Sequence, residues 1–372
     1  MKILFATGGT GGHINPALAV ANRIRKIYGD KAQILFVGTA DHMESRLVPN
    51  AGFDFKTIEI SGFQRSFTPE DIKKNLITVK RMFTSSTEAK KIIEEFSPDV
   101  VVGFGGYVSG PVVRKAALMG YKTIAMENNA LPGVTTKLLA KYVDKILLDV
   151  EESKKYLPAD KEYVVTGNPV RQEIFTEDRK AARDFYNVGD KICLLSFGGS
   201  LGAQRLNEAV ADLMAWHLRE RDFVHIHGSG SYYGPSYYFD LLKEKGIDAA
   251  KHNNLIIREY INDMPRCLAA ADLVISRCGA ITLAEIRAAG KASVLIPSPN
   301  VAENHQYHNA MVLANHGAAV VIEEKDLTGE SLCEAVKTLT DNPAEIARLS
   351  ANAKALAVPD ANERIRKEIL EL

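Results

Sequence analysis

The sequence lacks the features that mark several broad classes of protein. Its 46 basic residues balance 46 acidic residues, and a formal net charge of zero argues against a general nucleic-acid-binding protein. No apolar stretch approaches the ~20 residues that a membrane-spanning helix needs. The apolar run that follows Lys2 is too short for a secretory signal peptide. We therefore expect a chain that does not cross a membrane.

Cysteine and metal-binding patterns are equally scarce. The four cysteines form no C-x-x-C pair and no metal-ligand spacing, so we expect reduced, mostly buried thiols at Cys193, Cys267, Cys278 and Cys333. The sequence contains no Asp-x-Asp, the carboxylate pair that commonly holds a divalent metal on a nucleotide diphosphate. We expect neither a metal nor another cofactor. A leaving diphosphate would then be stabilised by helix N-termini and arginine.

What the sequence does have is a regular alternation of short apolar runs and helical stretches. At roughly 150 residues per domain, its 372 residues predict about two domains. Runs such as 100–102 and 292–296 are typical of parallel strands buried on both faces. The pattern predicts an α/β protein with parallel sheets. Its strands are expected near residues 2–6, 33–37, 55–60, 99–103, 122–126, 145–148, 162–166, 191–197, 222–227, 254–257, 272–275, 292–296 and 318–322.

The linker between the two domains is expected at residues 167–170. This Gly-Asn-Pro-Val stretch punctuates the chain, because proline restricts the residue before it. We therefore expect a first Rossmann-like domain over 1–166 and a second over 167–345. The final helical stretch, 346–372, is expected to return to the first domain.

Two glycine-rich turns lie about half a chain apart, at 8–12 and 198–202. Each follows an apolar run and opens a helical stretch, so its backbone N–H groups and the helix dipole suit a phosphate or another anion. Two copies suggest two Rossmann-like domains with a ligand between them. A dinucleotide site is a weak interpretation, because Ile14 stands where the third glycine of that pattern belongs. The alternative is two tight turns without a ligand.

Three features of the first half follow predicted strands. His13 comes directly after the first glycine turn and could act as a general base, contact an acceptor hydroxyl, or simply cap and pack. The glycine-rich loop 104–111 allows close approach of the backbone to a ligand, or is shaped for domain packing. The polar residues 127–129 belong at the ligand-binding edge of an open sheet, although Asn128 could only form a turn.

In the second half, the polar residues concentrate around 277–306. Gly279 opens a helix whose N-terminus can face a phosphate, and Arg277 could neutralise a diphosphate. Glu285, one to two turns into that helix, can accept hydrogen bonds from ribose hydroxyls. A surface pair between this glutamate and arginine is the alternative. The loop 297–306 carries amide and imidazole groups that suit sugar hydroxyls, although polar loops are usually only solvated.

One further segment, residues 72–83, has a basic amphipathic pattern. Ile72, Leu76, Val79 and Phe83 recur at helical spacing, with lysine and arginine residues between them. Such a helix suits an anionic membrane surface. On periodicity alone, an ordinary helix packed on the first domain is the simpler interpretation.

Together these motifs resemble those of the MurG family, the bacterial peptidoglycan N-acetylglucosaminyltransferases. The matching segments, 8–13, 104–111, 167–171, 198–200 and 277–285, run in order over nearly the whole chain. The resemblance implies a GT-B fold, in which two Rossmann-like domains face a central cleft. It also implies inverting transfer of GlcNAc from UDP-GlcNAc to the MurNAc C4 hydroxyl of lipid I, which gives lipid II and UDP in cell-wall synthesis.

Carried over residue by residue, the resemblance assigns the acceptor and the membrane to the first domain and UDP-GlcNAc to the second. It makes His13 the candidate for acceptor activation and places Glu285 on the ribose, and we take these two as catalytic candidates. The implied substrate-binding residues are Thr10, Gly11, Gly12, Asn129, Arg171, Ser200, Ile261, Arg277, Ala280, Ile281, Thr282, Leu283, Ala284 and Gln306. The implied membrane-docking residues are Ile72, Lys73, Leu76, Val79, Lys80 and Phe83.

The implied partners are UDP-GlcNAc, lipid I, an anionic membrane surface and proteins of cell-wall synthesis and division. The implied location is the cytoplasmic face of the bacterial membrane, as a peripheral protein. Three other functions stay open: a diacylglycerol glycosyltransferase, a UDP-GlcNAc 2-epimerase and a non-catalytic nucleotide-binding protein. The basic segment and the loop 104–111 favour a lipid acceptor over the last two.

Overall fold

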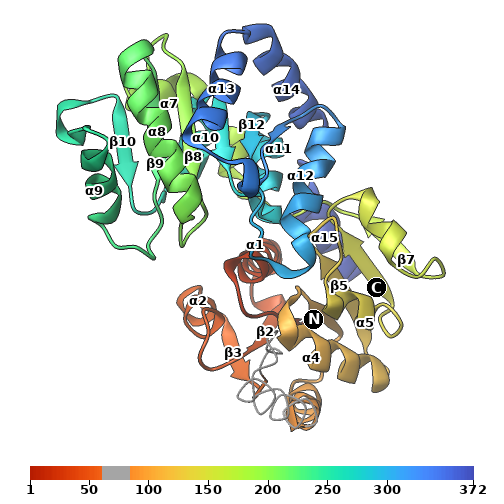
Figure 1. The fold of residues 1–372 in the computed structure, drawn as a ribbon. Helices are drawn as coiled ribbons and strands as arrows, with labels where there is room; N and C mark the ends of the chain where they lie inside the picture. Colours follow the sequence, from red (N-terminus) through yellow and green to blue (C-terminus); the bar gives the residue numbers. More distant parts are fainter. Residues whose placement is uncertain (61–83) are drawn as a thin grey trace, which may run out of the picture. The chain divides into compact units, whose positions relative to one another are not determined.

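The computed structural model describes residues 1–60 and 84–372 (Figure 1). These residues form two compact units. Unit 1 comprises Met1–Pro169 together with Asp360–Leu372, and unit 2 comprises Val170–Pro359. The chain therefore passes from one unit to the other at Pro169 and passes back at Asp360.

The sheet of unit 1 has seven strands in the order β3-β2-β1-β4-β5-β6-β7. All of its neighbouring strands are parallel. Their bounds are β1 Lys2–Ala6, β2 Gln33–Gly38, β3 Asp54–Thr57, β4 Val100–Gly103, β5 Lys122–Glu127, β6 Lys145–Leu148 and β7 Glu162–Val165. Every residue of the central strand β4 is buried, as its uniformly apolar sequence predicts.

The sheet of unit 2 has six parallel strands in the order β10-β9-β8-β11-β12-β13. Their bounds are β8 Cys193–Phe197, β9 Val224–Gly228, β10 Leu255–Arg258, β11 Leu273–Ser276, β12 Ala292–Leu295 and β13 Val320–Val321. This is the strand order of a doubly wound Rossmann sheet, and unit 1 has the same order with one more strand at its edge. The predicted α/β class, parallel sheets and strand positions are confirmed.

Helices connect the strands in both units. In unit 1 they are α1 Gly11–Tyr28, α2 Glu44–Asn50, α4 Gly106–Leu118, α5 Val134–Leu139 and α15 Ala361–Leu370, and residues 84–96 are also helical. In unit 2 they are α6 Glu173–Thr176, α7 Arg179–Phe185, α8 Gln204–Glu220, α9 Tyr237–Glu244, α10 Met264–Ala270, α11 Ala280–Ala289, α12 His305–Asn315, α13 Gly329–Thr340 and α14 Pro343–Ala355.

The C-terminal stretch differs from the single returning helix that the sequence suggested. It forms two helices, of which α14 belongs to unit 2 and α15 to unit 1. Figure 1 shows α15 in dark blue among the red-to-yellow elements of unit 1. Its buried side chains Ile365 and Ile369 join the core cluster that contains Ile14 of α1. Glu368 of α15 also forms an ion pair with Lys145 of β6, at 2.6 Å.

The described residues hold no disulfide. All four cysteines are free; three are buried and Cys333 is half-buried. The part of the chain that the structure describes contains no cluster of three or more His, Cys, Asp or Glu side chains arranged to hold a metal ion. Among those same residues, no helix has the length and apolar character needed to span a membrane.

Candidate functional site

The motifs singled out in the sequence lie at the carboxyl edges of the two sheets. Strand order changes direction between β1 and β4 in unit 1, and between β8 and β11 in unit 2. The glycine turns follow β1 and β8, while the segments 104–111 and 277–285 follow β4 and β11. Open α/β sheets bind ligands at this point of the topology. Within each unit, the fold therefore brings two sequence motifs to the expected ligand edge.

The first glycine turn leads directly into α1. Gly9 has a φ of 92°, Thr10 is the N-cap, and Gly11, Gly12 and His13 are the first helical residues. The His13 N–H donates to the Thr10 carbonyl at 3.0 Å, so the N–H groups of Gly11 and Gly12 are the ones left at the open end of the helix. The turn also touches the loop after β4, because a Cβ on Gly106 would lie 2.3 Å from the Gly8 carbonyl oxygen.

His13 packs against the loop that begins at Phe104. A Cβ on Gly105 would lie 2.6 Å from the His13 Nδ1 atom, so only glycine leaves room for the imidazole. Gly105 also has a φ of 89° and is the N-cap of α4. The two glycine-rich motifs of unit 1 thus meet around the histidine that the sequence singled out.

A side-chain amide holds the first turn of α1, and a second amide holds the first in place. Asn128, which follows β5, donates from Nδ2 to the Gly12 carbonyl at 3.1 Å. Asn168, which follows β7, donates from Nδ2 to the Asn128 carbonyl at 2.9 Å. Asn129 is anchored separately, since its backbone N–H donates to the Glu127 carboxylate at 2.9 Å. Asn128 therefore positions the glycine turn rather than only its own loop.

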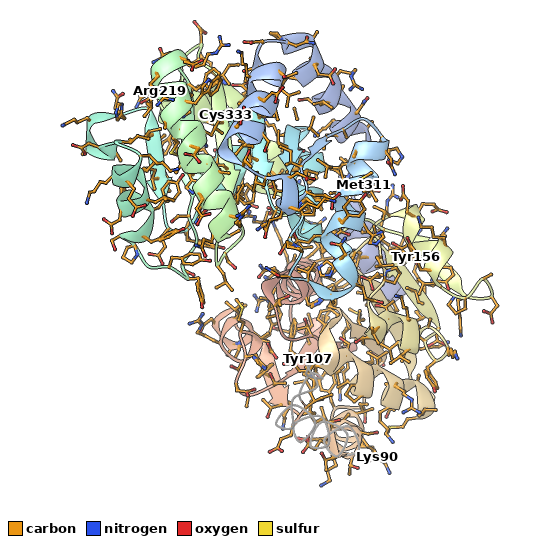
Figure 2. All side chains as sticks on the ribbon, in the orientation of Figure 1. Lys90, Tyr107, Tyr156, Arg219, Met311 and Cys333 are labelled. Atoms are coloured by element: carbon orange, nitrogen blue, oxygen red, sulfur yellow. The ribbon has the colours of Figure 1, made fainter. Side chains whose placement is uncertain are left out.

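Sequence reasoning missed Glu44, a fully buried carboxylate at the start of α2. It accepts hydrogen bonds from the Gly9 N–H at 3.2 Å, the Thr39 N–H at 3.1 Å and the Thr39 hydroxyl at 2.7 Å. Burial, and next the Glu44 charge, raise the pKa of the Tyr107 hydroxyl; Figure 2 labels this tyrosine on α4. The sequence signal that could have identified Glu44 is its position, since it is an acidic residue six positions after the strand that ends at Gly38.

The second glycine turn is joined to the loop after β9 by backbone hydrogen bonds. Ser231 N–H donates to the Ser200 carbonyl at 3.1 Å, and Tyr232 N–H donates to the Leu201 carbonyl at 3.2 Å. A Cβ on Gly202 would lie 2.2 Å from the Ser229 carbonyl oxygen, so the two loops are in close backbone contact. Ser200 is exposed at this turn, and α8 begins at Gln204.

Ile261 lies in the loop that follows β10. Its side chain is only 6% exposed and rests on Gly228, the last residue of β9, where a Cβ would come within 3.1 Å of Ile261 Cδ1. It thus forms an apolar surface at the carboxyl edge of β9. This is a suitable environment for one face of a nucleobase.

The helix α11 carries the predicted segment 280–285 and begins directly after the N-cap Gly279. Ala280, Leu283 and Ala284 are buried, whereas Ile281 and Thr282 are half-buried. Arg171 donates from Nε and Nη2 to Glu285 Oε1, at 3.0 and 2.8 Å. Within the described residues no donor bonds to Oε2. Burial raises the pKa of the Glu285 carboxyl, against the opposing charge of Arg171.

Arg277 has surroundings different from those expected. Its guanidinium forms an ion pair with Glu324 and donates to the backbone carbonyls of Ile296 and Pro297 at 3.3 Å. Its side chain is 11% exposed. Arg277 therefore ties the loop after β12 to the end of β11, and the pair with Glu285 is made by Arg171 instead.

Gln306 connects the same two loops from the start of α12. Its Oε1 atom accepts hydrogen bonds from the Cys278 N–H at 3.1 Å and the Ser298 N–H at 3.0 Å. Because the oxygen accepts both of these hydrogen bonds, the Nε2 group is the part of the amide that can donate to a ligand. The predicted residues of unit 2 thus share one edge of its sheet. The predicted docking residues at 72–83 lie outside the described residues.

Models of known families match almost the whole chain. The glycosyltransferase family 28 N-terminal domain matches residues 3–148, and the glycosyltransferase family 28 C-terminal domain matches residues 193–365. The chain belongs to glycosyltransferase family 28. Its division into two family 28 domains follows the two sheets described above. The chain is therefore a glycosyltransferase.

Relatives within family 28 align along their full length. An Acetivibrio thermocellus protein is 41% identical over 100% of this chain and 98% of its own, and a Lactococcus lactis protein is 39% identical over 100% and 99%. Both are named UDP-N-acetylglucosamine–N-acetylmuramyl-(pentapeptide) pyrophosphoryl-undecaprenol N-acetylglucosamine transferase. The crystal structure of Acinetobacter baumannii MurG superposes with a TM-score of 0.79 at 27% identity, covering 100% of this chain and 99% of that one. The resemblance drawn from the motifs is confirmed.

Proposed function

We propose that this chain transfers GlcNAc from UDP-GlcNAc to the C4 hydroxyl of the MurNAc unit of a lipid-linked acceptor, giving a disaccharide lipid and UDP in peptidoglycan synthesis. One observation carries the proposal. A relative named as a transferase for these substrates is 41% identical over 100% of this chain, and the candidate motifs that the structure describes follow strands of both sheets.

The donor is proposed to bind unit 2. Ile261 would contact uracil, and the free Oε2 side of Glu285 would accept from the ribose hydroxyls. Ser200 and the N-termini of α8 and α11 would bind the diphosphate, because their N–H groups stabilise negative charge. The Nε2 group of Gln306 would contact the GlcNAc hydroxyls. Arg171 would hold Glu285 in place, as its two hydrogen bonds to Oε1 already do.

The acceptor is proposed to bind unit 1, with His13 as the general base. The acceptor C4 oxygen attacks C1 of GlcNAc, the bond from C1 to the diphosphate oxygen breaks, and UDP leaves with the bonding electrons. His13 takes the hydroxyl proton, and attack from the face opposite UDP inverts C1. Gly11 and Gly12 open α1, and the resemblance implies that they and Thr10 would border the donor diphosphate and that Asn129 would contact the donor.

We further propose that unit 1 docks on an anionic membrane. Among the described residues, α5 exposes two apolar side chains of its own, Val134 and Leu138, which are 60% and 64% exposed. Leu118 at the end of α4 and Tyr142 are also exposed, and α4 contacts α5. The Arg114 guanidinium lies 5.0 Å from the centre of the Tyr142 ring. Apolar side chains beside basic ones suit a surface of anionic lipid.

The test is UDP release from UDP-GlcNAc in EDTA, with and without a short-chain lipid I analogue. Acceptor-dependent release and a disaccharide product are expected. The His13→Ala variant should bind UDP normally but turn over about 10²- to 10⁴-fold more slowly. Conversion of UDP-GlcNAc to UDP-ManNAc without acceptor would instead indicate an epimerase. Full turnover by His13→Ala with an unchanged pH profile would remove its role as the base.

A further inference from the structure

Three neighbouring loops at the carboxyl edge of the unit 2 sheet are joined by backbone hydrogen bonds. The loop after β9 donates from Ser229 N–H to the Arg258 carbonyl at 2.9 Å and from Gly230 N–H to the Glu259 carbonyl at 2.8 Å. On its other side, the same loop donates from Ser231 N–H to the Ser200 carbonyl of the second glycine turn. The loops after β10, β9 and β8 therefore form one connected layer.

The loop after β10 is closed by side chains at both of its ends. Arg258, the last residue of β10, forms an ion pair with Asp263, the residue before α10. The four residues between them include Ile261. The ion pair thus joins the two ends of the short loop that presents Ile261 to Gly228.

Tyr186 fixes this closed loop to the body of unit 2. This 5%-exposed residue follows α7, and its hydroxyl donates to Asp263 Oδ2 at 2.7 Å. The hydroxyl also lies 3.1 Å from the Cys267 sulfur of α10, and the Arg258 guanidinium lies 5.5 Å from the centre of the Tyr186 ring. Asp263 accepts from both partners, one on each carboxylate oxygen.

We propose that Tyr186, Asp263 and Arg258 are positioning residues for the donor nucleotide, acting through Ile261. The proposal rests on the proposed function, in which Ile261 contacts uracil. Loss of the tyrosine hydroxyl leaves one Asp263 oxygen without its neutral donor and frees the loop from α7. Uracil would then contact an Ile261 side chain whose loop is less rigidly positioned. Binding of UDP weakens as a result, while the rate of the chemical step is unchanged.

The first experiment measures UDP affinity and steady-state kinetics of the Tyr186→Phe variant. We expect the Kd for UDP and the KM for UDP-GlcNAc to rise about three- to tenfold, the size of one ordinary net hydrogen bond, because the tyrosine acts on the nucleotide only through the loop. The kcat and the KM for the acceptor should change less than about twofold. Tyr163→Phe is the matched control, since it removes a tyrosine hydroxyl that donates to a backbone carbonyl in unit 1.

A double-mutant cycle with Ile261→Ala separates positioning from general destabilisation. If Tyr186 acts through Ile261, Tyr186→Phe should have little further effect on UDP affinity in the Ile261→Ala background. Arg258→Gln, which opens the loop from its other end, should show the same dependence.

Two outcomes would overturn the inference in distinguishable ways. An unchanged Kd in Tyr186→Phe, or full additivity with Ile261→Ala, refutes the positioning role while leaving the proposed function intact. Failure of the unmodified chain to bind UDP would remove the proposed function itself, and the positioning role with it.

Discussion

At the residue scale, the sequence identified most of the polar groups at the two sheet edges but not their partners. Arg171 and Glu285 were expected to contact the donor separately, yet they form a pair across 114 positions of the chain. Arg277 was expected to face a diphosphate but is bound to Glu324. Motifs predict which residue types reach an edge. Pairings between distant segments depend on tertiary packing, which a single sequence does not reveal.

Glu285 gives the prediction at this scale. Replacing it by glutamine removes the charge opposite Arg171 and one acceptor for ribose, so the KM for UDP-GlcNAc should rise about tenfold or more. Because the pKa of Glu285 lies above that of an ordinary carboxyl, acidification should weaken UDP binding at a higher pH than usual, as the carboxylate is lost. The Glu285→Gln variant should lack this pH dependence in calorimetric titrations.

The control for that measurement is Glu345→Gln, which removes the carboxylate of a more exposed arginine pair on α14 of the same unit. It should bind UDP like the unmodified chain. An equal loss of affinity in both variants, or no loss in Glu285→Gln, would contradict the assignment of the ribose contact.

At the scale of elements, the strands were predictable because short apolar runs bounded by turn residues are typical of buried parallel strands and are too short for most helices. Their order is also the expected one for two Rossmann-like sheets. The polar interior of unit 2 was not predicted. Ser196 of β8 lies 2.8 Å from His225 Nε2 and from His227 Nδ1, and His217 of α8 lies 3.2 Å from His225. The pairing of β8 with β9 brings Ser196, His225 and His227 together on one face of the sheet, and the packing of α8 adds His217.

This histidine cluster predicts acid sensitivity of unit 2. Burial lowers the pKa of His217 to about 4 and that of His227 to about 3. Below pH ~6.5 these histidines become protonated in the unfolded chain but stay neutral in the folded chain. The free energy of unfolding should therefore fall as the pH drops from ~6.5 towards ~4, by up to ~1.4 kcal/mol per pH unit for each histidine.

Urea unfolding between pH 7 and pH 4 tests that dependence. His217→Gln, which does not titrate in this range, should flatten the slope of unfolding free energy against pH. His42→Gln, at an exposed position of unit 1, should not. Identical slopes for all three proteins would show that the cluster does not govern acid stability.

At the scale of the whole molecule, the length and the two glycine turns predicted two domains, and the ordered motifs implied a glycosyltransferase through their resemblance to a known family. Membership of family 28 bears out the glycosyltransferase. The surface that would reach the membrane was harder to predict. The exposed leucines of α4 and α5 were not singled out in the sequence, because their exposure depends on which surfaces the fold leaves uncovered.

Membrane docking gives the prediction at this scale. Leu138→Glu places a negative charge in the apolar surface of α5, so the fraction that floats with phosphatidylglycerol vesicles at low salt should fall about tenfold. Phe239→Glu, at an exposed aromatic of α9 in unit 2, is the control and should float normally. Equal flotation of the two variants would place the docking surface elsewhere.

The placement of α15 has a consequence for how the protein matures. The residues of this helix leave the ribosome after every residue of unit 2, yet their side chains Ile365 and Ile369 complete the core around α1. As the chain leaves the ribosome, all residues of unit 2 emerge before α15, which belongs to unit 1. The core of unit 1, although it contains the N-terminus, can therefore form in full only after the core of unit 2.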